Sequence, residues 1–273
     1  MDAQIRRANA FKALHERDTA FVIPNPWDAG SAKMLASLGF SALATTSAGY
    51  AFSQGRPDGG LTLGETLANV RAIVAATHLP VAVDLENGFA DEPDECAQSI
   101  LLAAQAGAVG GSIEDATGRE DAPIYGFEHA VARIEAAVAA ARSLPFAFTL
   151  TARAENFLHG KPDLDDTIRR LQAFAEAGAD VLYAPGLRNA GDVVAVVRAV
   201  APKPVNVLMS GGLPLTVEQL SVMGVKRISV GSALALAAYG EFFRAAQEIQ
   251  ASGTFGFTAR SMPFQQANQL FKG

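Results

Sequence analysis

Residues 81–88 read Val-Ala-Val-Asp-Leu-Glu-Asn-Gly, a short apolar run that ends in acidic side chains. A run of this length and composition is typical of a buried strand. Strand side chains alternate between two faces, so Asp84 and Glu86 lie on the same face. Residues 109–115, Val-Gly-Gly-Ser-Ile-Glu-Asp, repeat the pattern and place Glu114 at the end of another strand. These runs predict neighbouring strands that carry acids at their carboxyl ends.

The same alternation of a short apolar run with a longer Ala- and Leu-rich segment continues along the chain, as in repeated βα units. We expect strands at Phe21–Pro24, Ala42–Thr46, Val81–Glu86, Val109–Glu114, Phe146–Arg153, Val181–Pro185, Val205–Met209 and Arg227–Gly231. We expect helices at Ala29–Leu38, Leu63–Thr77, Pro93–Ala106, Phe127–Ser143, Leu164–Ala177, Ala190–Val200, Thr216–Met223 and Ala233–Gln250.

Eight evenly spaced units without a Gly-rich dinucleotide fingerprint favour an α/β fold closed into a (β/α)8 barrel of TIM type over a doubly wound open sheet. Residues 1–253 are expected to form this barrel, with a leading helix over residues 2–16. Residues 254–273 are expected to form a C-terminal helical arm, in which Phe257–Phe271 is a short arm with a terminal helix. The phenylalanines of the arm predict packing on a partner subunit, and the alternative is packing on the outside of its own barrel.

Composition excludes several classes of partner. The 273 residues are 49% hydrophobic and 18% charged, which indicates a compact globular protein. The net charge is −6 and no basic run occurs, which argues against nucleic acid and anionic membranes as partners. The single cysteine, Cys96, allows no internal disulfide. The N-terminus lacks the apolar core of a secretory signal, so we expect a soluble, cytoplasmic protein.

Acids at the ends of the barrel strands predict a cation site. Reacting groups of such barrels lie at the carboxyl ends of the strands, where Asp84, Glu86 and Glu114 would converge. They would repel one another unless protons or a cation intervene, and an all-oxygen set suits Mg²⁺, with Mn²⁺ as an alternative. Mg²⁺ retains several waters, so Asp84 could bind directly while Glu86 and Glu114 hold coordinated waters. The other interpretation of Glu86 is a helix cap.

Other polar residues are candidates for holding an anionic substrate. Arg153 ends the fifth strand, where its guanidinium could clamp a carboxylate, although it could instead form an ion pair with Glu155 or with the acids. Residues 47–50, Ser-Ala-Gly-Tyr, are interpreted as a small-residue turn whose N–H groups could form an anion nest. Asp58 lies in a polar loop and could point back into the mouth of the barrel, or could simply belong to a turn.

The ordered set Ser47-Ala48-Gly49, Asp58, Asp84-x-Glu86-x-Gly88, Glu114-Asp115 and Ala-Arg153-x-Glu155 resembles the isocitrate lyase and phosphoenolpyruvate mutase superfamily over almost the whole chain. The resemblance implies that Asp84 ligates Mg²⁺, with Glu86 and Glu114 in support through waters. It also implies that Arg153 and the backbone of Ser47, Ala48 and Gly49 grip the carboxylate and carbonyl of the substrate.

The same resemblance implies that Asp58 lies near the reacting group and that the segment around Asn206 contributes to substrate binding. It further implies a homo-oligomer, a dimer or a tetramer with swapped helices. Glu86 stands where Asp is commoner in the superfamily. The loop after the fourth strand, residues 116–125, lacks the Lys-Lys-Cys-Gly-His segment of the lyases. It also lacks the Lys and Asn of the mutase branch, whose His after the sixth strand is likewise missing.

A metal and enolate site without the lyase cysteine predicts decarboxylation of an oxaloacetate-like 2-oxo carboxylic acid, because the leaving CO₂ needs neither a thiol nor an acid. The alternatives are retro-aldol cleavage of a 2-hydroxy or 2-oxo acid, or C–P cleavage, with Asp58 or Tyr50 as the proton carrier. A phosphate-binding barrel using the glycines at 211, 212 and 231, and a non-catalytic barrel that binds 2-oxo acids, are further alternatives. No lysine ends a strand, which argues against Schiff-base chemistry.

Overall fold

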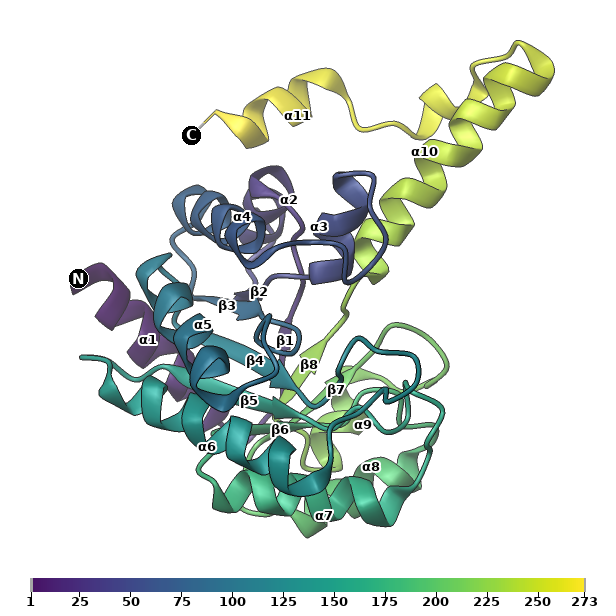
Figure 1. The fold of residues 1–273 in the computed structure, drawn as a ribbon. Coiled ribbons are helices and arrows are strands. Elements are labelled where there is room, and N and C mark those ends of the chain that lie inside the picture. The colour runs from purple at the N-terminus through teal and green to yellow at the C-terminus, as the bar shows by residue number, and fades with distance from the viewer. Residues whose placement is uncertain (1, 273) are drawn as a thin grey trace.

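A computed structural model describes residues 2–272 and shows eight parallel strands that form a nearly closed barrel (Figure 1). The strands are β1 Phe21–Ile23, β2 Leu43–Ala44, β3 Val81–Asp84, β4 Gly110–Glu114, β5 Thr149–Arg153, β6 Val181–Tyr183, β7 Val205–Leu208 and β8 Arg227–Ser229. Their order is β1-β8-β7-β6-β5-β4-β3-β2. The Ala44 N–H donates to the Pro24 carbonyl at 3.2 Å and bridges the remaining gap between β1 and β2. The predicted (β/α)8 barrel is confirmed.

Helices surround the strands, and most of them lie where the sequence predicts them. They are α1 Asp2–His15, α2 Ala29–Ser37, α3 Ser47–Ser53, α4 Leu63–Ala76, α5 Pro93–Gln105, α6 Phe127–Ser143, α7 Leu164–Glu176, α8 Ala190–Ala199, α9 Val217–Val222, α10 Ala233–Ser252 and α11 Phe264–Phe271, with a 3₁₀ helix at Gly256–Arg260. The terminal helix expected in the arm is α11, and the 3₁₀ helix precedes it.

The interpretation of residues 47–50 as a turn is wrong, because these residues begin helix α3. Thr46 caps the helix, and its side-chain oxygen accepts the Gly49 N–H at 3.2 Å. A Cβ added to Gly49 would lie 2.7 Å from Thr46 Cγ2, so this first turn packs too closely for a larger residue. The small side chains permit the close packing and also hide the helical periodicity in the sequence.

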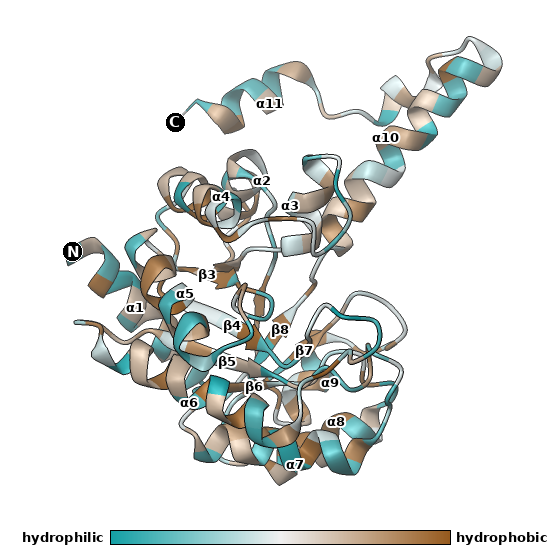
Figure 2. Ribbon diagram, in the orientation of Figure 1, coloured by the Kyte–Doolittle hydropathy of each residue, from teal (hydrophilic) through white to brown (hydrophobic). Residues whose placement is uncertain are grey.

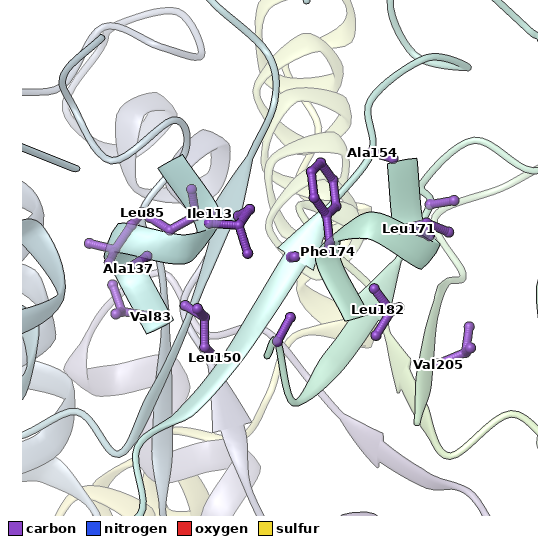
Figure 3. Close-up of a cluster of buried hydrophobic side chains, with 14 of the residues drawn as sticks. Val83, Leu85, Ile113, Ala137, Leu150, Ala154, Leu171, Phe174, Leu182 and Val205 are labelled. Atoms are coloured by element: carbon purple, nitrogen blue, oxygen red, sulfur yellow. The ribbon is translucent and has the colours of Figure 1, made fainter. Parts of the chain in front are cut away.

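The main hydrophobic core lies between the strands and the surrounding helices (Figure 3). Val83, Leu85 and Ile113 are buried there, together with side chains of α6 and α7. Because strand side chains alternate, this packing turns Asp84 and Glu114 toward the barrel axis. The outward apolar positions therefore place the acids in the interior.

Helix α1 covers the amino ends of the strands. Phe11 and His15 are buried there, and their rings meet edge-to-face with centroids 4.8 Å apart. Phe21 at the start of β1 lies edge-to-face against His15 at 5.0 Å. This aromatic cluster packs beneath the barrel, opposite the carboxyl ends of the strands where the acids lie.

Helix α10 leaves the barrel and projects beyond it, and α11 returns across the top of the molecule (Figure 1). The Lys33 ammonium donates to the Phe271 carbonyl at 3.5 Å, so α11 reaches the surface of α2. Hydrophobic positions are distributed along α10 and α11 (Figure 2). No helix within residues 2–272 is long and apolar enough to cross a membrane.

Candidate active site

Two adjoining cavities open at the carboxyl ends of the strands and hold most of the predicted site residues. The inner cavity has a volume of about 220 Å³, and its walls include Ser47, Ala48, Asp58, Asp84, Arg153 and Asn206. The outer cavity, of about 780 Å³, is lined by Glu86 and Glu114 and shares Ser47, Asp58 and Arg153 with the inner one. The structure thus brings residues from β2, β3, β4, β5 and β7 to one place.

Arg153 lies at the centre of the acids. Its Nη1 donates to Asp84 Oδ1 at 3.0 Å, its Nη2 lies 3.0 Å from Glu114 Oε2, and its Nε donates to Glu155 Oε1 at 2.8 Å. The guanidinium also stacks over the Tyr183 ring at 5.1 Å. Without a ligand, Arg153 therefore forms the ion pairs that the sequence left as its alternative role.

Asp84 is held in one orientation by neighbouring strands. Its Oδ2 accepts the Ser47 hydroxyl at 2.9 Å and the Ser47 N–H at 3.3 Å. Its own N–H donates to Thr45 Oγ1 at 3.0 Å. These bonds point the carboxylate into the inner cavity, at the position predicted for a metal ligand.

Glu86 provides the clearest sign of a missing partner. Its Oε1 is buried and makes no hydrogen bond. Its backbone has φ 49°, a left-handed conformation that non-glycine residues rarely adopt. Burial, and then the negative charges of Asp84 and Asp58, raise its pKa from 4.5 to about 7. The side chain does not cap a helix, so that alternative interpretation is wrong.

Excess negative charge defines the electrostatics of this site. We call Asp84, Glu86, Glu114 and Glu155 the rim acids, and three of them pair with Arg153. Burial raises the pKa of Glu114 well above its usual value, although Arg153 opposes the shift. Burial and the Asp84 charge likewise raise the pKa of Asp58, which stands at the solvent-exposed edge. A further cation would relieve this repulsion.

The residues present fit a hard divalent cation. The rim acids offer carboxylate oxygens, and the unpartnered Glu86 oxygen is one of them. Within residues 2–272, no three His, Cys, Asp or Glu side chains form a preassembled metal cluster. Arg153 occupies the space between the acids, which agrees with a site that uses one direct carboxylate and others through water.

Two predicted residues lie away from the cavity walls. Gly49 packs against Thr46, Trp27 and Ala235, and its N–H is already bonded to Thr46. Tyr50 is the next residue of α3 and is not among the residues that line either cavity. The predicted substrate contact of the Ser47–Gly49 backbone is thus supported by position only for Ser47 and Ala48.

The sequence did not identify three of the four polar residues that lie deeper in the inner cavity. We call Thr151, Asn206, Arg227 and Ser229 the floor cluster; of these, only Asn206 was predicted to bind substrate. Arg227 Nε donates to Asn206 Oδ1 at 2.9 Å, and Arg227 Nη2 donates to Thr151 Oγ1 at 2.9 Å. Asn206 Nδ2 donates to Ser229 Oγ at 2.9 Å. Alternation along β8 is the sequence signal that places Arg227 and Ser229 on one inward face.

Comparison with known families identifies the group to which this site belongs. Residues 11–250 match the family model of phosphoenolpyruvate phosphomutase. The chain belongs to this family. An uncharacterised protein of Mycobacterium tuberculosis is 36% identical over 231 residues, which cover 82% of each chain. The 2-methylisocitrate lyase of Salmonella typhimurium is 30% identical over 256 residues, which cover 88% of this chain and 82% of that enzyme.

Solved structures agree with this membership. A protein of Burkholderia cenocepacia J2315, provisionally described as a lyase or mutase, shares 59% identity with a TM-score of 0.97 and covers 100% of this chain and 98% of its own. An oxaloacetate acetylhydrolase in complex with its product oxalate shares 26% identity with a TM-score of 0.86, over 98% of this chain and 93% of its own. A phosphonopyruvate hydrolase with oxalate and Mg²⁺ has the same fold at 22% identity, TM-score 0.86, over 97% of this chain and 94% of its own. The chain is thus a member of a superfamily of lyases and mutases.

The loop after β4 borders the outer cavity. Ala116 and Ile124 form an antiparallel bridge, and the Thr117 N–H donates to the Pro123 carbonyl at 3.0 Å. Arg119 Nη1 pairs with Asp91 at 2.7 Å, and the hydroxyl of Tyr125, which ends the loop, donates to the same carboxylate. The loop is therefore held at the cavity edge by Asp91.

Cys96 lies outside this loop. It is buried on α5, and its Sγ would meet a Cβ on Gly88 at 2.7 Å. Burial raises the pKa of its thiol, which keeps it protonated. The expected role as a small buried side chain agrees with this environment.

Proposed function

We propose that this member of the phosphoenolpyruvate phosphomutase family is a Mg²⁺-dependent carbon–carbon lyase that decarboxylates a small, oxaloacetate-like 2-oxo acid. The observation that carries the proposal is the excess negative charge of the rim acids, with its unpartnered Glu86 oxygen, beside a small enclosed cavity. Asp84 would hold the ion directly, and Glu86 and Glu114 would hold its waters. When bound there, Mg²⁺ polarises the carbonyl of a 2-oxo acid, which stabilises an enolate.

The protein's own groups orient the substrate. Arg153 has five N–H donors, of which three serve the rim acids, so the remaining two can reach the 2-oxo oxygen of a substrate in the cavity. The Ser47 hydroxyl and N–H keep Asp84 facing the same space. The substrate is thereby held between a fixed carboxylate and a fixed guanidinium.

Decarboxylation requires few further groups. The bond between C3 and the leaving carboxylate breaks, its electron pair moves toward the C2 carbonyl, and CO₂ departs. A proton then adds to C3 and yields the shorter 2-oxo acid. Asp58 stands at the cavity edge with a raised pKa, and we assign it the delivery of this proton. No thiol is needed, in agreement with Cys96 lying elsewhere.

Product analysis tests this function. Purified protein with MgCl₂ and oxaloacetate should release pyruvate and CO₂ faster than MgCl₂ alone at the same pH. Formation of oxalate and acetate instead would show hydrolytic cleavage, the reaction named for one of the structural neighbours, and would overturn decarboxylation. Pyruvate release no faster than the metal background would do the same.

We also propose that the chain forms a homo-oligomer through α10 and the arm that follows it. Phe242, Phe243, Phe255 and Phe264 are each more than half exposed on these segments. Apolar side chains at this density on a projecting helix match a surface that a second copy covers. Light scattering should give the mass of a dimer or tetramer, and the mass of one chain at micromolar concentration would contradict the proposal.

A further inference from the structure

Arg227 is a buried cation that has no negatively charged partner. Its exposed fraction is 6%, and its hydrogen-bond acceptors, Asn206 and Thr151, are neutral. The titratable groups that act on its charge are Tyr183 and Arg153, with no carboxylate of residues 2–272 among them. Burial of a charge is unfavourable unless an opposite charge or a ligand compensates it.

The neighbouring groups do not supply that compensation. His15 Nε2 lies 3.5 Å from Arg227 Nη1, and burial together with Arg227 lowers the His15 pKa to about 3. Burial raises the Tyr183 pKa to about 12. Both side chains are therefore neutral at pH 7. Burial lowers the Arg227 pKa to about 10, which still leaves the guanidinium charged. The floor of the cavity thus carries a net positive charge.

Space for an anion lies directly above this charge. Barrel interiors are usually filled by bulky branched side chains. Here Ala44, Ala82 and Ser112 face the inner cavity, and Arg227, Asn206, Thr151 and Ser229 complete its deep end. Arg227 bonds to two neutral oxygens and faces His15, which leaves guanidinium N–H donors without a partner.

We propose that Arg227, with Asn206, Thr151 and Ser229, forms an anion subsite in the barrel interior that binds a carboxylate of the substrate. The inference rests on the proposed function in taking the ligand to be a 2-oxo acid. A guanidinium stabilises the charge of the carboxylate that it binds, whereas a carboxylate that leaves as CO₂ must lose its charge. The subsite therefore holds the carboxylate that the product retains, and the leaving carboxylate lies toward the outer cavity.

Calorimetric titration of pyruvate and of its uncharged analogue pyruvamide, in buffer with MgCl₂, tests the subsite. The wild type should bind pyruvate more tightly than pyruvamide. Arg227→Met should reduce this preference by about 30-fold or more, since loss of one partner of a buried, hydrogen-bonded charge pair has effects of that size. Arg198→Met removes an exposed arginine of α8 that lines neither cavity and serves as the matched control, with the preference unchanged.

A second variant tests the subsite even if Arg227→Met fails to fold. Asn206→Leu keeps Arg227 but removes the amide that orients it, so it should weaken pyruvate binding by about 10-fold while pyruvamide binding changes less. An unchanged preference for pyruvate in Arg227→Met and Asn206→Leu would overturn the subsite. If the wild type prefers pyruvate to pyruvamide but turns over no 2-oxo acid, the proposed function is wrong. A loss of the preference for pyruvate in Arg227→Met would still support the subsite in that case.

Discussion

Two arginines face the interior of the same barrel, and their surroundings are opposite. Arg153, at the carboxyl end of β5, contacts three carboxylates. Arg227, at the amino end of β8, donates to a neutral amide and a neutral hydroxyl. Negative charge is in excess around the first arginine, and positive charge is uncompensated around the second. The cavity between them is therefore electrically polarised along the barrel.

This polarity matches the two ends of a metal-chelated 2-oxo acid. The rim acids need a cation, and the floor cluster needs an anion. A neutral ligand would satisfy neither end, and an anion without a metal would meet the rim acids as well as Arg227. The difference between the two arginines thus indicates a ligand that brings both charges together. The predictions below test each end separately.

The largest effect is expected at the rim. Asp84→Asn removes the charge that we assign to direct metal binding, so kcat for oxaloacetate decarboxylation should fall. Residues that only orient metal ligands cause losses of up to about 100-fold when they are mutated, so the loss of a direct ligand should exceed about 100-fold. Steady-state assays with MgCl₂ measure it. Asp18→Asn, an exposed acid between α1 and β1 that lines neither cavity, is the control and should retain most activity. Near-normal turnover by Asp84→Asn would show that the rim does not hold the reactive metal.

The next largest effect is a difference in unfolding free energy, measured in EDTA, between variants of the two arginines. Arg153→Met leaves three carboxylates without their cation, so the free energy of unfolding should fall by about 3 kcal/mol. Arg227→Met removes an uncompensated buried charge, and its unfolding free energy should stay within about 1 kcal/mol of the wild type. Urea unfolding of both variants provides the measurement. Equal losses of unfolding free energy in the two variants would mean that Arg227 stabilises the fold as Arg153 does. The proposed difference between the two arginines would then be wrong.

Repulsion among the rim acids should also make the free energy of unfolding depend on pH. The pKa of Glu86 is raised from 4.5 to about 7, so its ionised form is less favourable in the folded state than in the unfolded chain. Its cost is absent below pH 4.5 and grows as the pH rises toward 7. In EDTA, the free energy of unfolding of the wild type should therefore fall as the pH rises from 4.5 to 7. The fall for Glu86→Gln should be smaller by about 1–2 kcal/mol.

Melting temperatures from pH 4.5 to 8 check the Glu86 prediction, with intervals chosen around its shifted pKa. Glu135→Gln, an exposed position on α6, is the control and should follow the wild-type curve. Parallel curves for wild type and Glu86→Gln would show that the carboxylate is compensated without a metal. Addition of MgCl₂ should bring the wild-type curve closer to that of Glu86→Gln.

The fold was largely predictable because each βα unit carries its own periodicity. All eight strands lie within the predicted ranges, although β5 begins at Thr149 rather than at Phe146. Residues 146–148 are apolar because they pack against the hydrophobic core before the strand begins. A pattern of hydrophobic residues does not distinguish such a segment from the strand itself. Pro263, which precedes α11, agrees with a terminal helix of the arm that begins directly after it.

Glu86 lies beyond the end of β3 with φ 49°, so alternation along the strand does not account for its position. Asp84 and Glu114 were predictable for the same local reason as the fold, since each ends a strand on its inward face. The floor cluster was not, because Arg227 takes its partners from β5 and β7, 76 and 21 residues away. A charged residue at the start of a strand also lies opposite the mouth, where sequence reasoning does not search for chemistry. The central place of Arg153 among the acids likewise depends on register between strands.

The smallest effect concerns a neutral partner of the floor arginine. Thr151→Val keeps the side-chain shape but removes the acceptor of Arg227 Nη2, so the unfolding free energy should fall by about 1 kcal/mol. Thr66→Val is a matched control, because the Thr66 hydroxyl is buried without a partner and its removal should be neutral or stabilising. If pyruvate occupies the freed donor, saturating pyruvate should reduce the penalty of Thr151→Val and leave Thr66→Val unchanged. A penalty that persists with pyruvate would mean that the anion does not reach this depth of the barrel.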